Sequence, residues 1–162
     1  MRDLEKDFDH WLPYHSSRSV DGGSSWSPLQ PLHAGCARPR LLNVEGTGTL
    51  LLSGGRYHAG KTSDVLLWAS KDAGKSWTEH SISYEHNRQS AQHNKTSMVS
   101  SEVNSTKWPI GGKQRLTSAY TALVRLGPKQ VLVTYDLHTA LGGFPTSDPR
   151  SDTTFSMVVT VD

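Results

Sequence analysis

Cysteine, long apolar runs and a strong charge of one sign are all scarce in this chain. Cys36 is the only cysteine among the 162 residues, so the chain cannot form an internal disulfide, and its cysteine content does not identify a compartment. No apolar stretch approaches the ~18 residues that a membrane-spanning helix needs. The first seven residues carry charges where a signal peptide has an apolar core. We therefore expect no membrane span, and the localisation stays unknown.

The charges and histidines exclude further classes of partner. The 17 basic and 15 acidic residues give a net charge of +2, and the basic residues are scattered rather than clustered as on a nucleic-acid-binding surface. The eight histidines show no metal-ligand spacing, and no nucleotide-binding motif is present. The sequence thus predicts no nucleic-acid partner, no metal site and no cofactor.

One sequence motif, by contrast, occurs twice. The motif S-x-D-x-G-x-x-W occurs at residues 19–26 and again at residues 70–77, with starts 51 residues apart. A period of roughly 40–50 residues is typical of the blades of a β-propeller, each of which is a four-stranded sheet. The spacing therefore predicts a repetitive β architecture with one motif in each repeat.

The motif residues have a structural explanation. Asp and Ser side chains accept hydrogen bonds from nearby backbone N–H groups in turns, Gly adopts positive φ, and Trp covers a turn with apolar surface. We therefore expect scaffold hairpin turns that lie far from any ligand pocket, with the tryptophans packed beneath them. The residues given this role are Ser19, Asp21, Gly23, Trp26, Ser70, Asp72, Gly74 and Trp77.

Short apolar or alternating runs predict the strands around these turns. Four of them, at residues 41–44, 49–53, 65–70 and 77–83, are expected to form an antiparallel sheet, with a Gly-containing turn at residues 45–48 and the second motif between the last two strands. Three more strands are expected at residues 119–126, 130–135 and 153–161. The predicted fold class is all-β.

Two segments lack this patterning. Residues 85–114 are rich in Ser, Asn, Gln, Lys and Gly, and we interpret them as a polar loop, either a disordered insertion, which the composition favours, or a functional excursion. The loop contains N-glycosylation sequons at Asn94 and Asn104, which matter only in a secreted protein. Residues 1–17 are interpreted as a terminal segment that is either disordered or the remnant of a preceding strand.

Several of these segments resemble the sialidase (neuraminidase) superfamily. The two repeated motifs are similar to its Asp boxes, also called BNR repeats. The run ARPRLL at residues 37–42 and the strands after it are similar to a late blade, and SAYT at residues 118–121 resembles the segment that carries the nucleophile. The resemblance implies a partial six-bladed β-propeller of sialidase type over residues 18–162, with about three blades present at roughly 45 residues each. The remaining propeller blades are then expected in a longer chain.

The resemblance also implies a chemistry. Exo-α-sialidases are glycoside hydrolases that remove terminal sialic acids with a tyrosine nucleophile, a glutamate that takes its proton, an aspartate acid/base and three arginines on the substrate carboxylate. On this basis Tyr120 is the candidate nucleophile, while Arg56 and, less directly, Arg18 are candidates for binding the carboxylate. The expected partner is a sialylated glycan or another carbohydrate.

Parts of the family's catalytic set have no match in this sequence. It contains no convincing first arginine followed by Ile-Pro, no acid/base aspartate and no nucleophile-partner glutamate, and we interpret Arg38-Pro39-Arg40 as structural. The isolated chain is therefore expected not to hydrolyse sialosides, since general acid–base help is worth about 10²–10⁴-fold. The alternative left open is a non-catalytic Asp-box propeller module that binds glycans or protein.

Overall fold

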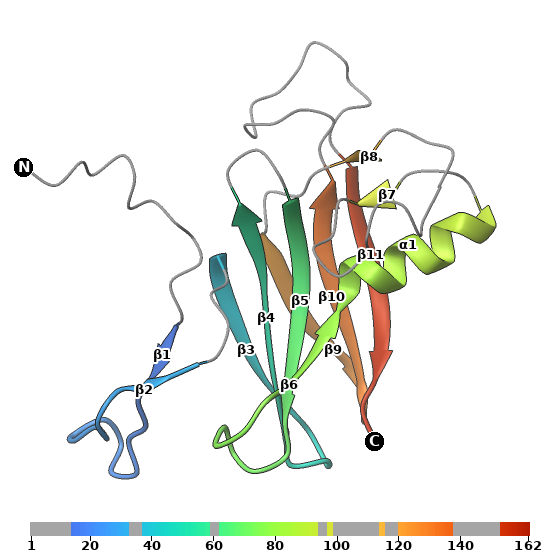
Figure 1. Cartoon of the computed structure of the whole chain (residues 1–162). Coiled ribbons are helices and arrows are strands. Elements are labelled where there is room, and N and C mark those ends of the chain that lie inside the picture. The colour runs from blue at the N-terminus through green and yellow to red at the C-terminus, as the bar shows by residue number, and fades with distance from the viewer. Residues whose placement is uncertain are drawn as a thin grey trace, which may run out of the picture.

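The computed structural model describes residues 14–32, 37–58, 62–93, 97–98, 114–115, 120–137 and 153–162. Most of the regular structure in these segments is antiparallel β-sheet, and one helix runs beside it (Figure 1). The mainly β structure agrees with the predicted fold class except for that helix.

The larger sheet has four strands, which follow one another in space as they do in sequence. They are β3 (Ala37–Val44), β4 (Thr49–His58), β5 (Thr62–Ser70) and β6 (Thr78–Ser81), each antiparallel to the next. The β3–β4 turn contains Gly46 and Gly48 with φ of 74° and 68°, values that glycine adopts without steric cost. The predicted four-stranded sheet is confirmed, and β3, β4 and β5 extend beyond the apolar runs that predicted them. The fourth strand is shorter than the predicted run at residues 77–83, because the last two of those residues begin a helix.

The second sheet repeats this sequential order with three strands. They are β9 (Thr121–Gly127), β10 (Gln130–Leu137) and β11 (Thr153–Thr160), paired antiparallel in the order β11-β10-β9. A tight turn joins β9 to β10 and places Lys129 at a φ of 62°. The three strands expected in this part of the sequence are confirmed.

Two minor strand pairs lie outside these sheets. An antiparallel pair, β1 (His15–Ser16) with β2 (Gln30–Pro31), carries the first motif, and a parallel pair joins β7 (Ser97–Met98) to β8 (Gln114–Arg115). Strand β1 falls in the terminal segment for which a preceding strand is one of the two alternatives. Residues 1–13 lie outside the described part of the chain.

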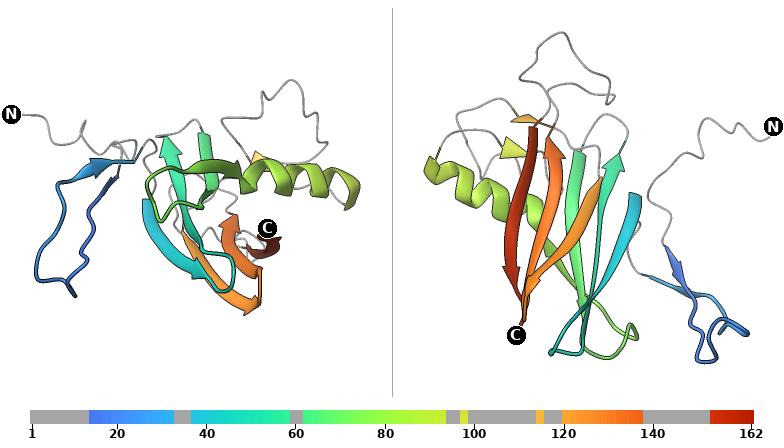
Figure 2. Two further views of the ribbon diagram at one scale, coloured as in Figure 1. Left: turned by 90° about the horizontal axis from the view of Figure 1, so that it is seen from below. Right: turned by 180° about the vertical axis from the view of Figure 1, so that it is seen from behind.

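The main hydrophobic core lies between the two sheets. Figure 2 shows, in its view from below, how the sheets lie against each other. Because successive strand side chains point to opposite faces, one face of each sheet supplies this core. Its buried members come from both sheets, from the start of the helix and from the end of the chain: Val44, Leu51, Val65, Leu67, Ile82, Val131, Val133, Tyr135 and Val161.

The larger sheet also buries part of its other face. A second cluster comprises Leu52, Leu66 and Trp68, with Tyr14, Leu32 and Trp77 packed against it. The central strand β5 is therefore apolar at every position from 65 to 68, as expected of a strand covered on both sides. The indole of Trp68 donates to the carboxylate of Glu79 on β6 at 2.8 Å, so its polar atom is satisfied within the cluster.

The helix α1 (Ile82–His93) begins close to where the polar loop was expected. The hydroxyl of Ser81 accepts a hydrogen bond from the N–H of Tyr84 at 2.9 Å, which caps the first turn. Glu85 then accepts hydrogen bonds from Arg88 and Gln89, one turn further along. The prediction of a polar loop starting at residue 85 is therefore wrong for residues 85–93, and both sequon asparagines lie outside the described residues.

Polar contacts attach α1 to both sheets. His86 Nδ1 lies 2.8 Å from the Tyr135 hydroxyl, and its ring packs edge-on against Phe155 with centroids 4.8 Å apart. The Ser83 hydroxyl accepts the N–H of Val65 at 2.8 Å. Burial raises the pKa of the Tyr135 phenol well above its usual value, so this hydroxyl stays neutral and serves as a hydrogen-bonding group.

Candidate functional site

The first Asp-box turn joins β1 to β2 and is closed by its own side chains. The Ser19 hydroxyl donates to Asp21 Oδ1 at 2.7 Å and accepts the N–H of Gly23 at 2.7 Å. Asp21 in turn accepts the N–H and the hydroxyl of Ser25, at 2.9 and 2.6 Å. Gly23 has a φ of 94°, so the position favours glycine.

The second turn joins β5 to β6 and repeats this network. The Ser70 hydroxyl donates to Asp72 at 2.8 Å and accepts the N–H of Gly74 at 2.7 Å, while Asp72 accepts both the N–H and the hydroxyl of Ser76. Gly74 has a φ of 87°. The two copies of the motif therefore form the same turn, and the prediction that each is a side-chain-stapled hairpin is confirmed.

The two tryptophans differ in their surroundings. Trp77 is partly buried against the second apolar cluster, as predicted. Trp26 is 64% exposed, and its indole N–H donates to the carbonyl of Gly23 at 3.1 Å. Trp26 thus lies against Gly23 of its own turn, as predicted, but it is not buried there, because β1 and β2 supply only a two-stranded ribbon rather than a sheet face under the first turn.

We expect Gly74→Ala to destabilise the protein by about 1–2 kcal/mol, because a residue with a Cβ is strained at this positive φ. The added methyl would itself be in ordinary contact with Trp77 and Leu50, at 3.5 and 3.8 Å, so strain rather than a clash is the cause. The matched control is Ala73→Gly, since Ala73 already has a φ of 59°. Urea denaturation should show a change of less than about 0.5 kcal/mol for the control, and equal losses in both variants would contradict the strain argument.

The carboxylates of Asp21 and Asp72 make the stability of the two turns depend on pH at the acid end of the scale. Hydrogen bonds from the hydroxyl and then the N–H of Ser25 lower the pKa of Asp21 from 3.8 to about 2, and the equivalent contacts from Ser76 lower that of Asp72. Because each folded pKa lies below the unfolded value, the stabilisation is complete above that value and is lost as the pH falls toward the folded pKa. Both carboxylates are at the surface, so salt weakens part of the effect.

We therefore expect the Ser25 and Ser76 amide signals in an NMR pH titration to stay constant down to about pH 4 and to shift with midpoints near or below about pH 2. The double variant Asp21→Asn, Asp72→Asn should lack these transitions. Midpoints near the unfolded value of 3.8 in the unaltered chain would show that the hydrogen bonds do not persist in solution.

The candidate nucleophile and one of the candidate carboxylate-binding arginines lie at the end of the sheets opposite the second Asp-box turn. Strand β3 starts, β4 ends and β5 starts at this end, and the hydroxyls of Ser53 on β4 and Thr121 on β9 lie 2.8 Å apart where the two sheets meet. Tyr120 directly precedes β9, and Arg56 lies on β4 in register with Asp64 of β5. The second Asp-box turn sits at the opposite end of β5 (Figure 1).

Tyr120 is covered on one ring face by an arginine. The guanidinium carbon of Arg38 lies 4.0 Å from the centroid of the Tyr120 ring, a cation–π geometry, while 48% of Tyr120 stays exposed. Arg38 has a φ of 49° and sits in an irregularity of the β3–β4 pairing, immediately before Pro39. Such a conformation is costly for a non-glycine residue and typically occurs where the surroundings impose it, often at functional sites.

The sequence did not connect Arg38 with Tyr120. Arg38-Pro39-Arg40 lies between the two Asp boxes, 82 residues before Tyr120, which is too late in the chain for the family's first arginine and is the reason for the structural interpretation. Only the packing of the two sheets brings Arg38 to Tyr120. The one available signal was Arg-Pro at the start of a strand, since a residue before proline avoids helical backbone angles. The structure therefore adds Arg38 to the residues around Tyr120.

Arg18 lies elsewhere. It is exposed on the first hairpin and, with Lys75 and Trp77 of the second Asp-box turn, lines a cavity of about 700 Å³. Its backbone N–H donates to the Ser27 hydroxyl at 3.0 Å. The structure thus brings Arg38 to Tyr120 and places Arg18 beside a scaffold turn at the opposite end of β5.

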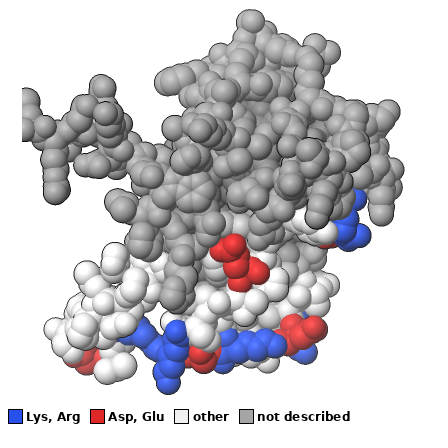
Figure 3. Space-filling model, viewed as in Figure 1, with Lys and Arg blue, Asp and Glu red and all other residues white. Residues whose placement is uncertain are grey.

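The face shown in Figure 3 carries charges of both signs along the end that holds the turns. One mixed contact there joins Arg125 and Glu45, whose charged atoms are 4.0 Å apart, and Arg125 also donates to the carbonyl of Asn43. Among the residues described, no cluster of three His, Cys, Asp or Glu side chains could hold a metal ion. Nor does the described part of the chain include a helix that is long and apolar enough to cross a membrane.

Comparison with models of known protein families and with curated protein sequences finds no match to this chain.

Proposed function

We propose that this chain is part of a sialidase-like β-propeller and that the sheet end around Tyr120 binds a carboxylate-bearing sugar of the sialic acid type. The observation that carries the proposal is the half-exposed Tyr120 ring held under the Arg38 guanidinium, at the end of the sheets opposite the second Asp-box turn. The second Asp-box turn occupies one end of the sheet, and the opposite end is available to bind a ligand.

The architecture supports the propeller part of the proposal. The two sheets have the same sequential antiparallel order and pack face to face through one core, as neighbouring blades do. Two turns with the same hydrogen-bond network, 51 residues apart in sequence, fit one turn in each blade. Residues 18–162 would then supply about three of six blades, and a longer chain would supply the others.

The chemistry supports tyrosine at this position. The anomeric carbon of a sialoside carries its own carboxylate, so an anionic Asp or Glu nucleophile would be repelled, whereas a neutral phenol is not. A phenol is a weak nucleophile until a neighbouring base takes its proton. In this proposal that base and the acid for the leaving group come from other blades, and this chain supplies the nucleophile and arginine contacts to the carboxylate.

Arginine suits the carboxylate because its planar fork binds two oxygens at once. In a catalytically active parent we expect Arg56→Ala to weaken binding of a sialoside by about 10- to 100-fold, the scale of one charge-assisted contact. The control is Arg18→Ala at the opposite end of β5, which should leave affinity unchanged. Calorimetric titration of both variants tests the assignment, and a loss only in Arg18→Ala would reverse it.

The second candidate function is a non-catalytic module that binds sialylated or other glycans. The sequence favours it in one respect, since it contains no match for the acid/base aspartate of sialidases or for the arginine followed by Ile-Pro. A fluorogenic sialoside assay and a binding titration on the same protein separate the two. Binding without turnover in the parent identifies the module, and turnover identifies the hydrolase.

A further inference from the structure

Strand β11 forms an outer edge of the second sheet. It pairs with β10 on one side, and within the described residues no strand pairs with its other side. In the larger sheet the equivalent strand, β5, pairs with β4 on one side and with β6 on the other. The two sheets therefore share an order but differ by one strand.

The end of β11 resembles the beginning of the repeated motif. Thr160-Val161-Asp162 matches the S-x-D of Ser70-Lys71-Asp72 if threonine replaces serine, and both hydroxyl residues are the last residues of their strands. Their partners agree as well, because Ser70 lies opposite Leu50 near the start of β4, and Thr160 lies opposite Gln130 at the start of β10. Threonine offers the same hydroxyl that staples the other two turns.

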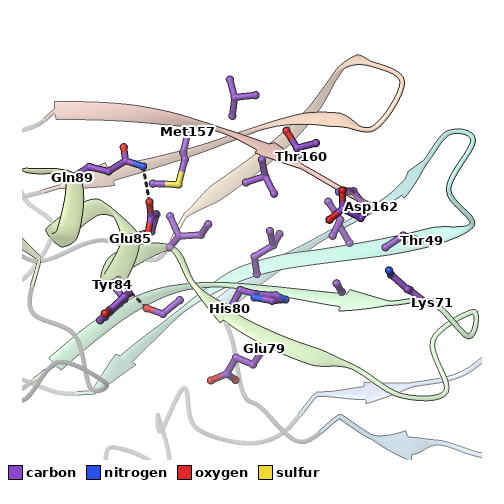
Figure 4. Close-up of a pocket in the computed structure, with 18 residues that line it drawn as sticks. Thr49, Lys71, Glu79, His80, Tyr84, Glu85, Gln89, Met157, Thr160 and Asp162 are labelled. Carbon is purple, nitrogen blue, oxygen red and sulfur yellow. Dashed lines mark hydrogen bonds between the residues drawn. The ribbon is translucent and has the colours of Figure 1, made fainter.

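A groove of about 710 Å³ runs along this edge (Figure 4). Its walls come from one face of the larger sheet, from the start of α1 and from β11, and include Leu51, Leu67, His80, Ile82, Met157 and Val159. His80 lies opposite Leu67, whose side chain faces the core between the sheets, so His80 shares that face although it is exposed. The face thus continues past the part that the second sheet covers.

The order of the strands shows what fits there. Strand β9 contacts β3 and β4, so the second sheet lies across the first in the same strand order, and the position beyond β11 falls over β6 and the start of α1. A strand in that position would complete backbone pairing along β11 and cover the groove with every second side chain.

We propose that the edge of β11 and this groove receive a fourth strand, which is delivered by a third Asp-box turn beginning at Thr160. The occupant is a segment of the β6 type: a turn of the form T-x-D-x-G-x-x-W followed by a short extended strand antiparallel to β11. The groove is lined by both Lys71 and Glu85, so it suits a strand of mixed polarity rather than a strongly charged one. This inference rests on the sheets alone and stands whether or not the chain binds sialic acids.

The test appends residues 73–84, the second turn and β6 of this chain, directly after Asp162 in the register they have after Asp72. We expect the extension to raise Tm by at least about 5 °C and to slow amide hydrogen exchange along β11. Two controls accompany it: the same twelve residues in scrambled order, and the correct extension combined with Asp162→Ala. The scrambled extension should give no gain, and Asp162→Ala should remove most of the gain.

Equal Tm and equal β11 exchange for the correct and scrambled extensions would overturn the proposal. A second outcome would also overturn it, namely that the unextended chain forms a dimer through β11 and the correct extension leaves that dimer intact. In that case the edge would belong to a second copy of the chain. If the extended chain no longer dimerises and the amide hydrogens of β11 exchange more slowly, the result supports a fourth strand beside β11.

Discussion

Tyr120→Phe is expected to lower sialoside turnover by at least about 10³-fold in a catalytically active parent of this chain, the scale of losing an essential nucleophile or its base. The reason is that the substitution removes only the hydroxyl oxygen that would form the glycosyl–enzyme bond. The ring remains, so the Arg38 contact at 4.0 Å is kept. Affinity for the intact sialoside should therefore change by less than about tenfold.

Tyr84→Phe is the matched control for this experiment. Tyr84 is also exposed, at 39%, but it lies on α1 rather than at the start of β9. Its substitution should leave both turnover and affinity unchanged in assays with a fluorogenic sialoside. Full activity in Tyr120→Phe would remove Tyr120 as nucleophile, and equal losses in the two variants would point to damage of the fold.

The largest stability effect is expected for Leu51→Ala, at about 2–5 kcal/mol. Leu51 is 1% exposed and lies in the core between the two sheets, where its truncation leaves a cavity that both sheets must tolerate. Leu41 on the neighbouring strand β3 is the control, because it is 64% exposed and Leu41→Ala should cost less than about 0.5 kcal/mol. Urea denaturation followed by tryptophan fluorescence measures both.

This pair of variants tests whether the two sheets form one core. If Leu51→Ala were as mild as Leu41→Ala, the sheets would not be packed against each other in solution. A loss near the upper end of the range, with one cooperative transition, would support packing of the two sheets as a unit.

The sheets and turns could be predicted because local chemistry determines them. Gly46 and Gly48 mark a turn that needs positive φ, and the Ser and Asp residues of the repeated motif supply their own hydrogen bonds within a few positions. Such signals do not depend on distant parts of the chain, so a single sequence contains them.

The helix could not be predicted in the same way. Apart from Ile82 in the core, its stabilising contacts are polar: the Ser81 cap, the Glu85 pairs within the first turns, and the His86 contact with Tyr135, which lies 49 residues away. No apolar periodicity marks such a helix, so its polar composition is typical of a loop as well. Tertiary contacts therefore determine that this segment is helical.

The candidate site was predictable only in part. Tyr120 and Arg56 could be named from a resemblance, whereas the Arg38–Tyr120 contact depends on how two sheets pack and leaves no local signal other than Arg-Pro at the start of β3. The exposure of Trp26 likewise depends on what lies beneath the first turn rather than on the motif itself. In both cases the missing information is the arrangement of distant strands.

The most direct test of the proposed site is an NMR titration of the isotope-labelled chain with N-acetylneuraminic acid, with its methyl ester as the uncharged control. We expect the signals of Tyr120 and Arg38 to shift with the acid and much less with the ester, while the indole signals of Trp26 and Trp77 stay in place. Shifts confined to the tryptophans of the Asp-box turns, or equal responses to acid and ester, would contradict carboxylate recognition at this end of the sheets.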